Sequence, residues 1–361
     1  MTLPDQASER AGARGGPVGQ EFARVRAGAA WDRALLELDA EPSLLQSAGH
    51  AEVQLDEGWL PVGAILPSGS RAMVLIAGPP GLRRGYVPFG PVPATIDAIR
   101  ELVAWAREAG LVRLRVQPPV PLSSTPDLLA LGFRLGPSVT PGTGRRYSRY
   151  LYPEHTRVVP LGDPEAMLRA CKPKHRYNIR LALRRGVEVS MTDDVEELHR
   201  QQLATASRQG IVASHPEVYG RRVRALAWCH IYVARVGREA VGAIMVARFG
   251  TRAYYLFGGT TGTHHELMPA YALQWQAMID AAAAGCRSYD LFGVPPTDDP
   301  DHPWHGLWRF KAGFGGRVVS SPGAVDIVLR SLRAPFAIEY PRLSRAGLRR
   351  LAEHFRIGND R

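Results

Sequence analysis

The sequence predicts an α/β (α+β) fold of two similar halves, each built on a mixed sheet. Two observations predict it: a strand–turn–helix–strand unit occurs twice, and each copy belongs to a segment with β-hairpin patterns. At 361 residues the chain is long enough for two domains of ordinary size. We therefore expect a disordered segment at 1–28, domains at 29–155 and 156–335, and a C-terminal amphipathic helix or tail at 336–361.

Each copy of the unit has a strand with a Phe-Gly turn, a helix that ends at a glycine, and a second strand. The helix would cross over the sheet to reach the next strand. The first copy comprises Tyr86–Pro91, a helix at 96–109, Gly110 and a strand at 111–116. The second copy comprises Tyr254–Gly259, a helix at 270–284, Gly285 and a strand at 286–291.

Hairpins supply the other strands. The paired apolar runs are 62–66 with 72–76 around Pro67–Ser70, and 231–236 with 240–248 around Gly237-Arg238, before a strand at 253–257. A strand near 147–152 would close the first half. Hairpins followed by a crossover predict a mixed sheet, and they argue against a dinucleotide fold, in which strands and helices alternate from the start.

The chain is basic, with a net charge of +11 and a pI near 9.9 on a composition typical of a soluble globular protein. Such a charge predicts an anionic partner: nucleic acid, a phosphorylated substrate or an anionic membrane surface. The alternative is a general enrichment of arginine in the genome, without any anionic partner.

The three cysteines, Cys171, Cys229 and Cys286, are too few and too far apart for a disulfide framework or a zinc site. We therefore expect a reducing, cytoplasmic location and no bound metal. No stretch approaches the roughly 18 apolar residues of a membrane helix, and the N-terminus lacks the apolar core of a signal peptide.

A basic helix is predicted at 172–185, with Pro173 in its first turn and Gly186 after its end. It holds six Lys or Arg and no acid, and Arg176, Arg180 and Arg184 recur every four residues on one face. A polyphosphate backbone would neutralise that face, although a solvated surface is the alternative. His175 is interpreted as a capping or surface residue.

The segment Gly306–Gly316 holds one lysine, Lys311, in an apolar surround, with Phe310 beside it and a glycine-rich turn after it. On a cleft, Lys311 would meet developing negative charge and Phe310 would provide a stacking surface. The alternatives are a core position for Phe310 and a surface position for Lys311.

These segments together resemble the Fem (FemABX) transferases. The resemblance rests on 172–187, 254–259, 282–293 and 310–316, in the same order and with similar spacing, and covers most of residues 40–330. It implies tandem GNAT-like domains. Some members carry a coiled-coil arm, and no heptad stretch of that length occurs here, so an armless member is expected.

Members of this family take an amino acid from aminoacyl-tRNA and attach it to an amine of a cell-wall peptide precursor. An aminoacyl ester is already activated, so we expect no cofactor, and the chain has no Gly-x-x-x-x-Gly-Lys-Ser/Thr phosphate loop. The partners implied are therefore aminoacyl-tRNA and a peptide or amine acceptor.

By resemblance, Lys311 would stabilise the oxyanion and Phe310 would stack on the terminal adenine of the tRNA. Tyr254 or Tyr255 would orient the ester, and only one of them can face a given cleft because they alternate along a strand. Asp290 is a catalytic candidate, with a capping or structural acid as the alternative. The candidates for phosphate contact are Lys172, Lys174, Arg176, Arg180 and Arg184.

The acceptor side departs from the family pattern. Gln54, five residues before Trp59, and Phe89 stand where members that bind nucleotide- or lipid-linked precursors often have Lys and Arg. Both positions would contact the acceptor, but without a charge-assisted bond to phosphate. The acceptor is therefore a wall precursor or, alternatively, a small peptide or amine of a natural-product pathway.

Two other functions remain open. An acyl-CoA-dependent N-acyltransferase of the same fold would need an Arg/Gln-x-x-Gly-x-Gly/Ala run, and the chain has none. A non-catalytic RNA-binding module would display its basic residues on an open surface. The stretch Arg342–Phe355 is amphipathic and predicts either a peripheral membrane contact or packing on its own domain.

Overall fold

The computed structural model describes residues 28–146, 151–209 and 213–330 of the chain. The predicted N-terminal segment (apart from Gly28), the C-terminal stretch Arg342–Phe355 and most of the predicted strand at 147–152 lie outside the described residues. Leu151 and Tyr152, at the end of that predicted strand, are not in a strand.

The first sheet has six strands in the order β1-β2-β3-β4-β13-β5. Its pairs are antiparallel except β3 with β4, which are parallel and are joined through helix α4. The strands are β1 (Leu60–Ile65), β2 (Arg71–Ala77), β3 (Arg84–Pro88), β4 (Arg113–Gln117), β5 (Arg134–Leu135) and β13 (Val325–Val328). The helices of this half are α2 (Ala29–Leu38), η1 (Leu44–Gln46), α3 (Ala48–Asp56), α4 (Ile96–Glu108), η2 (Leu122–Ser124) and α5 (Thr125–Ala130).

The second sheet has seven strands in the order β12-β6-β11-β10-β9-β8-β7, and again one pair, β10 with β11, is parallel and joined through a helix, α10. Its strands are β6 (His155–Pro160), β7 (Val187–Thr192), β8 (Cys229–Val236), β9 (Glu239–Phe249), β10 (Arg252–Thr260), β11 (Ser288–Gly293) and β12 (Arg317–Ser320). Its helices are α6 (Pro164–Ala170), α7 (Pro173–Arg184), α8 (Val195–Gln209), α9 (Pro216–Ala225), η3 (His265–Leu267), α10 (Pro269–Ala283) and α11 (His305–Ala312).

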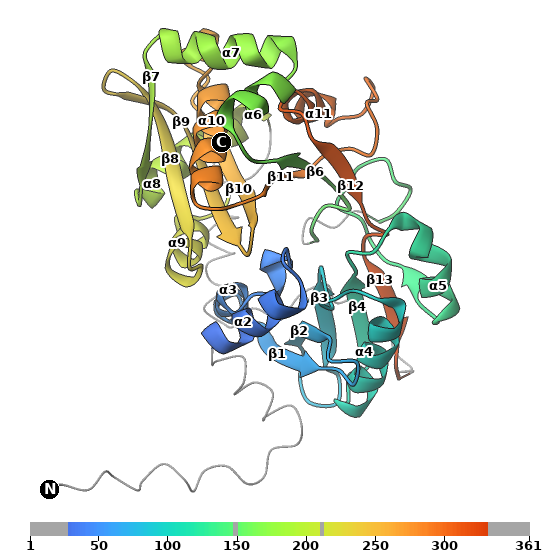
Figure 1. Ribbon diagram of the computed structural model, residues 1–361. Coiled ribbons are helices and arrows are strands. Elements are labelled where there is room, and N and C mark those ends of the chain that lie inside the picture. Colours follow the sequence, from blue (N-terminus) through green and yellow to red (C-terminus); the bar gives the residue numbers. More distant parts are fainter. Residues whose placement is uncertain (1–27, 147–150, 210–212, 331–361) are drawn as a thin grey trace, which may run out of the picture.

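The duplicated strand–helix–strand unit and the mixed sheets are thus confirmed (Figure 1). Each crossover helix ends at a left-handed glycine, Gly110 after α4 and Gly285 after α10, which supplies the positive φ that stops a helix. The predicted hairpin around Pro67–Ser70 is the β1–β2 pair, in which Ala64 faces Ala72.

The sheets do not end where the predicted domains end. β13 falls inside the predicted segment 156–335, yet it completes the first sheet between β4 and β5. Asp326 explains this return, because its carboxylate accepts hydrogen bonds from Arg115 at 2.7 and 2.9 Å and from Arg113 at 2.6 Å. These are tertiary contacts more than 200 residues apart, which no local pattern predicts.

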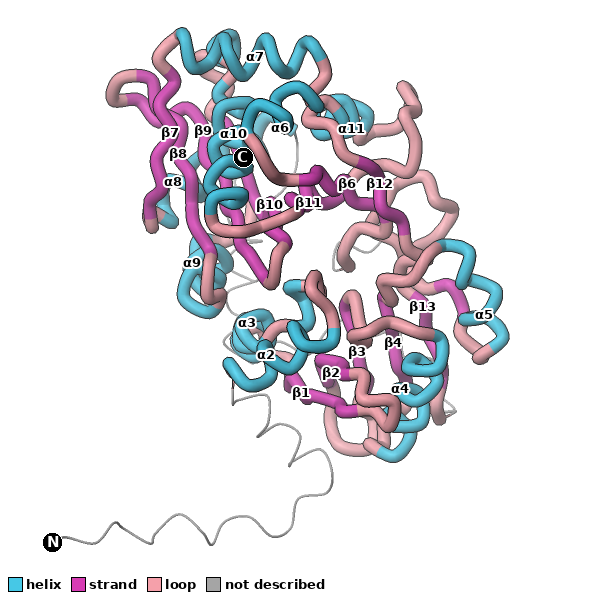
Figure 2. Tube along the Cα trace, viewed as in Figure 1, coloured by secondary structure: helices cyan, strands magenta, loops and turns pink. Residues whose placement is uncertain are grey.

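Three apolar clusters form the core. One lies between the first sheet and α4, and one lies between the second sheet and helices α7 and α10. Figure 2 shows the backbone of these helices and sheets. The third cluster joins the halves, with Trp31, Leu35 and Met73 from the first and Ile231 and Met245 from the second. This shared cluster holds the two sheets together and leaves a cavity beside it.

Candidate active site

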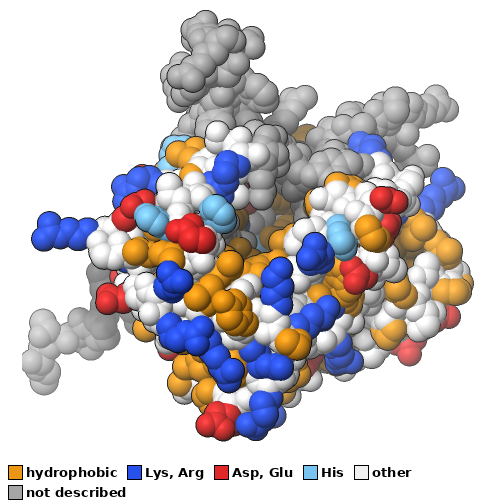
Figure 3. Space-filling model, turned by 90° about the horizontal axis from the view of Figure 1, so that it is seen from above, with side chains coloured by type: hydrophobic (Ala, Val, Ile, Leu, Met, Phe, Trp, Pro, Cys, Tyr) orange, Lys and Arg blue, Asp and Glu red, His pale blue; other side chains and the backbone are white. Residues whose placement is uncertain are grey.

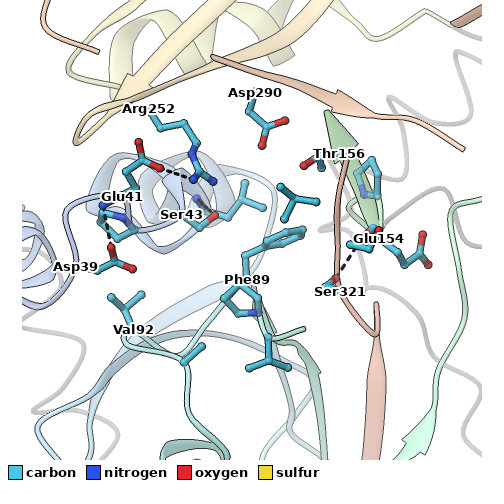
Figure 4. Close-up of a pocket in the computed structure, with 18 of the residues that line it drawn as sticks. Asp39, Glu41, Ser43, Phe89, Val92, Glu154, Thr156, Arg252, Asp290 and Ser321 are labelled. Atoms are coloured by element: carbon cyan, nitrogen blue, oxygen red, sulfur yellow. Dashed lines mark hydrogen bonds and ion pairs between the residues drawn. The ribbon is translucent and has the colours of Figure 1, made fainter. Parts of the chain in front are cut away.

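A cavity of about 680 Å³ lies between the two halves. The second sheet forms its roof through β10 and β11, and the loops that follow β3 and β4 form its floor (Figure 4). The floor is largely apolar, with Phe89, Val92 and several prolines, whereas Asp39, Glu41 and Arg252 lie on one wall. The cavity therefore combines an apolar floor with a charged wall and roof, as small-molecule sites do.

Asp290 and Tyr254 lie side by side in the roof because β10 and β11 pair in parallel with these two residues in register. Arg252, two residues before Tyr254, points to the same face of the sheet. The Tyr254 hydroxyl accepts from the Leu44 N–H and donates to the Pro42 carbonyl, both at 3.3 Å. Burial raises the pKa of Tyr254, so its phenol stays neutral.

Asp290 points into the cavity near Thr156 (Figure 4). One carboxylate oxygen accepts the Phe292 N–H at 2.8 Å, and this turn holds Phe292 at a left-handed φ of 58°. Burial raises the pKa of Asp290 to about 6, although Arg252, the Phe292 N–H and Lys311 act in the opposite direction. A carboxyl with a pKa near neutrality is suited to accept a proton during a reaction.

Lys311 lies on α11 and is only 4% exposed. Its Nζ donates to the Gly293 carbonyl at 2.8 Å and lies 5.7 Å from the centroid of the Tyr255 ring. Burial lowers the pKa of Lys311 to about 7, and the charge of Asp290 partly opposes this shift. Lys311 is thus neither a surface charge nor part of the cavity wall.

The position of Lys311 follows from the way β10 and β11 diverge. The two strands pair only from Arg252 to Tyr254 on one side and from Ser288 to Asp290 on the other. Beyond that point β10 has a bulge after Tyr255, and β11 shifts register before Gly293. Lys311 therefore reaches the end of β11, at the Gly293 carbonyl, where the sheet opens.

Tyr254 and Tyr255 lie on opposite faces of β10, as the strand alternation requires. Tyr254 lines the cavity, and Tyr255 packs on the α10 side near Lys311. Burial raises the pKa of Tyr255 to about 12, so it too is neutral. Their catalytic roles stay a prediction, and the structure gives Tyr254 the position facing the cavity.

Phe310 is half-buried in an aromatic cluster. Its ring centroid lies 5.3 Å from both Tyr271 and Phe314, with near-perpendicular planes, and 6.3 Å from His175. The structure thus gives Phe310 a mixed environment, partly core and partly surface, and stacking on adenine stays a prediction.

The basic helix forms as predicted, over Pro173–Arg184, and exposes Lys172, Lys174, Arg180 and Arg184. Figure 3, seen from the side of α7, shows Lys and Arg side chains across the middle of this face. Arg176 differs: it is half-buried, and its guanidinium donates to the Arg169 carbonyl at 3.1 Å and to the Cys171 carbonyl. Arg176 therefore stabilises the end of α6 as well as lining a groove of about 530 Å³ with Arg169 and Arg180.

The two acceptor candidates have different positions. Phe89 lies on the cavity floor at a left-handed φ of 49°, edge-on to Tyr152 at 6.4 Å. Gln54 does not line the cavity: it is 5% exposed on α3, and its amide donates to Glu57 at 3.0 Å. An acceptor contact for Gln54 stays a prediction, and in this structure the side chain bonds to the residue that caps its own helix.

Sequence reasoning missed the ion pair of Glu41 with Arg252 on the cavity wall. The same carboxylate also accepts from the Ser288 hydroxyl at 2.9 Å. Burial alone would raise the pKa of Glu41, but the hydrogen bonds and the charge of Arg252 outweigh burial, so the pKa is lowered. Glu41 lies in the loop before η1, and its partners are more than 200 residues away, so no local signal could have found it.

Within the described ranges, no group of three His, Cys, Asp or Glu side chains has the arrangement needed to hold a metal ion. In the same part of the chain, no helix combines the length and apolarity required to cross a membrane. Cys171, Cys229 and Cys286 are buried free thiols.

The chain is similar to known proteins in part of its sequence and in its fold. A family model described as the FemAB family matches residues 231–338. This match confirms the resemblance to the Fem transferases over that part of the chain. The fold is similar to that in a crystal structure of FemX, with a TM-score of 0.70, 18% identity, and coverage of 87% of this chain and 96% of that one.

Two further similarities have narrower meaning. The chain is 31% identical over 80 residues to the Lipid II:glycine glycyltransferase of Staphylococcus haemolyticus, which covers 22% of this chain and 19% of that protein. The match thus spans about a fifth of that relative's length. A conserved Bacteroides thetaiotaomicron protein of unknown function shares the fold, with a TM-score of 0.53, 10% identity and coverage of 84% and 96%.

Proposed function

We propose that this protein transfers an amino acid from aminoacyl-tRNA to an amine of a peptidoglycan precursor peptide, acting in the cytoplasm where charged tRNA is found. The supporting observation is the position of two buried titratable groups where β10 and β11 diverge: Asp290 lies in the cavity roof, and Lys311 reaches the Gly293 carbonyl at the end of β11. The match to a protein named as a Lipid II:glycine glycyltransferase supports the class of acceptor.

The donor side is assigned to α7 and α11. Lys172, Lys174, Arg180 and Arg184 are exposed on a helix without a single acid, so phosphate groups would relieve their mutual repulsion. The tRNA end would pass the aromatic cluster around Phe310 and bring its ester toward Lys311. No nucleoside triphosphate is required, because the ester already stores the energy of the amide bond to be formed.

The acceptor side is assigned to the cavity. Its apolar floor suits the aliphatic parts of a peptide, and its carboxylates suit an ammonium group. Arg252 is neutralised by Glu41, so it holds the wall in place rather than offering a free charge. Arg317, exposed at the cavity edge on β12, is available to an anionic group of the acceptor.

In the reaction, the acceptor nitrogen attacks the ester carbonyl carbon, a C–N bond forms and the C–O bond to the tRNA ribose breaks. Asp290 takes the proton lost by the attacking amine. In its protonated form, which its pKa of about 7 makes available near neutral pH, Lys311 stabilises the oxyanion of the tetrahedral intermediate. Asp290 then donates this proton to the ribose oxygen, which leaves as a hydroxyl, so charge and protons balance over the transfer.

The test is an incubation with tRNA carrying radiolabelled amino acids and a panel of acceptors: free precursor peptides, nucleotide-linked and lipid-linked precursors, and small peptides or amines. We expect label to move into a precursor. Label that stays on tRNA with every acceptor would refute the proposal, and transfer only to small amines would redirect it to a natural-product pathway. Acetyl-CoA in place of tRNA tests the N-acyltransferase alternative.

A further inference from the structure

The first turn of α7 contacts the last turn of α11, two helices that Figure 1 labels. One buried histidine is central to this contact. His175 on α7 is 6% exposed, and its Nε2 lies 2.8 Å from the carbonyl oxygen of Phe310 on α11. The backbone N–H of Lys172 donates to the Gly313 carbonyl at 2.8 Å. We refer to this contact, made by Lys172, His175, Phe310 and Gly313, as the α7–α11 junction.

The Phe310 carbonyl needs a partner, because the last four carbonyls of an α-helix have none within the helix. The carbonyls of Lys311 and Ala312 accept from backbone N–H groups of the following turn. His175 supplies the donor for Phe310 from the neighbouring helix. The Phe310 carbonyl oxygen can only accept a hydrogen bond, so the imidazole proton of His175 is assigned to Nε2.

Gly313 shows how closely the two helices approach. A Cβ at this position would lie 1.8 Å from a ring atom of His175, and the Gly313 φ of −74° is one that any residue can adopt. Glycine is therefore required here by the imidazole and not by the backbone conformation. The ring also packs edge-on against Tyr271 at 4.9 Å and Phe314 at 5.0 Å, which leaves it one position.

The α7–α11 junction lies next to proposed functional residues on both helices, Lys311 on α11 and the exposed lysines of α7. Lys311 follows Phe310 directly, and its Nζ holds the Gly293 carbonyl at the end of β11. Lys172 and Lys174, on either side of His175, are exposed to solvent on the basic face. A phosphate bound by these lysines would therefore contact the same turn of α7 that holds the α11 carbonyl.

We propose that His175 is a positioning residue that ties the basic face of α7 to Lys311, by donating Nε2–H to the Phe310 carbonyl. It touches no substrate. Its role is to hold the C-terminal turn of α11 so that Lys311 stays buried at the opening between β10 and β11. The catalytic part of this inference rests on the proposed function, whereas the effect on Lys311 does not.

The first experiment measures the titration of Lys311 without any substrate. The free energy of unfolding in urea is measured at pH 7.5, 8.5 and 9.5 for wild type and for Lys311→Met. The same comparison, with and without Lys311→Met, is repeated in proteins that carry His175→Leu or His175→Gln. A lysine that is buried and neutral changes the folding equilibrium constant about tenfold per pH unit relative to its Met variant. We expect this dependence in wild type and with His175→Gln, whose amide N–H can replace Nε2–H.

With His175→Leu the donor is lost, and we expect the pH dependence due to Lys311 to shrink severalfold, because α11 no longer holds the amine in place. Wild-type dependence with His175→Leu would overturn the proposal. A merely structural histidine would change stability equally at every pH, so this readout separates the two roles. His265→Leu, an exposed histidine on η3, is the matched control and should match wild type.

The second experiment disturbs the junction from the other side. Gly313→Ala places a methyl group on the imidazole and should reproduce the effect of His175→Leu. Combined with His175→Ala, which removes the ring, Gly313→Ala should add little, because the clash no longer exists. Additive effects of Gly313→Ala and His175→Ala would refute the contact on which the proposal depends.

The third experiment uses aminoacyl transfer. We expect His175→Leu to lower kcat on the order of 10- to 100-fold with little change in KM for charged tRNA, and His175→Gln to restore most of it. A rise in KM alone would overturn the positioning role. If wild type transfers nothing to any acceptor, the proposed function fails, and the titration and Gly313 experiments still decide whether His175 positions Lys311.

Discussion

Replacing Lys311 by Met should remove a specific pH dependence of stability. Lys311 is 4% exposed, and its pKa falls from 10.5 to about 7 because burial disfavours the ammonium. A difference of about 3.5 pH units corresponds to ~5 kcal/mol between the charged and neutral forms. Met has a similar length and no charge, so Lys311→Met keeps the packing and removes the titration.

The sign follows from proton binding. Between pH 7 and 10.5 the unfolded chain binds a proton at Lys311 and the folded chain does not. The free energy of unfolding therefore rises with pH by up to ~1.4 kcal/mol per pH unit in this window, and this contribution is absent in Lys311→Met. From pH 7.5 to 9.5, wild type should gain ~3 kcal/mol relative to the variant.

Urea unfolding at several pH values measures this difference directly, because the contributions of all other groups cancel between the two proteins. The loss of the Lys311 charge also affects its neighbour Asp290, but Asp290 is already ionised above pH 7.5 and adds only a constant offset. Lys174→Met, at an exposed position, is the control and should follow wild type. If the stability of Lys311→Met had the same pH dependence as wild type, the claim that Lys311 is buried and neutral would be refuted. If that variant transferred amino acid at the wild-type rate, Lys311 would have no catalytic role.

Three further changes test other parts of the molecule. Asp290→Asn should lower kcat/KM ~100-fold and abolish the fall in transfer rate that wild type is expected to show below about pH 6, as measured by transfer rates from pH 5 to 8. If the variant kept this fall in rate, the titrating group would be another residue. Arg180→Gln with Arg184→Gln should weaken tRNA binding and lower its salt slope by roughly 1 to 2, with an unchanged slope assigning that face to solvent. Gly316→Ala should lower the free energy of unfolding in urea by ~2–3 kcal/mol, because the φ of Gly316 is +68° and a Cβ would lie 2.2 Å from the Val158 carbonyl oxygen. Gly162→Ala, where a Cβ would lie in open space, is the control. Equal stabilities of the two variants would contradict the contact with Val158.

Much of the architecture was predictable from local patterns. The crossover helix after β3 was expected at 96–109 and lies at Ile96–Glu108, and the one after β10 was expected at 270–284 and lies at Pro269–Ala283. Amphipathic periodicity and a terminal glycine define such helices without reference to the rest of the chain. The strand 147–152 was not found in its described part, since Leu151 and Tyr152 are in irregular structure.

The candidate site was predictable only in part. Lys311 was selected as the single lysine of an apolar segment, and the structure buries it. The sequence predicts a capping or surface residue at His175; it does cap a helix, but its partner Phe310 lies 135 residues further along the chain. The sequence predicts an acceptor contact for Gln54 from its position five residues before Trp59. That spacing does not indicate on which face of α3 the side chain lies, and in the structure it bonds to Glu57.

The sequence by itself determined the repeated units, the mixed character of both sheets, the basic face of α7 and the resemblance to the Fem transferases, because each depends on residues close together in the chain. Only the tertiary structure decided that β13 returns to the first sheet, that Glu41 meets Arg252 and that His175 reaches Phe310. Those contacts depend on packing between distant elements, and the burial that this packing creates gives Lys311 and Asp290 their shifted pKa values.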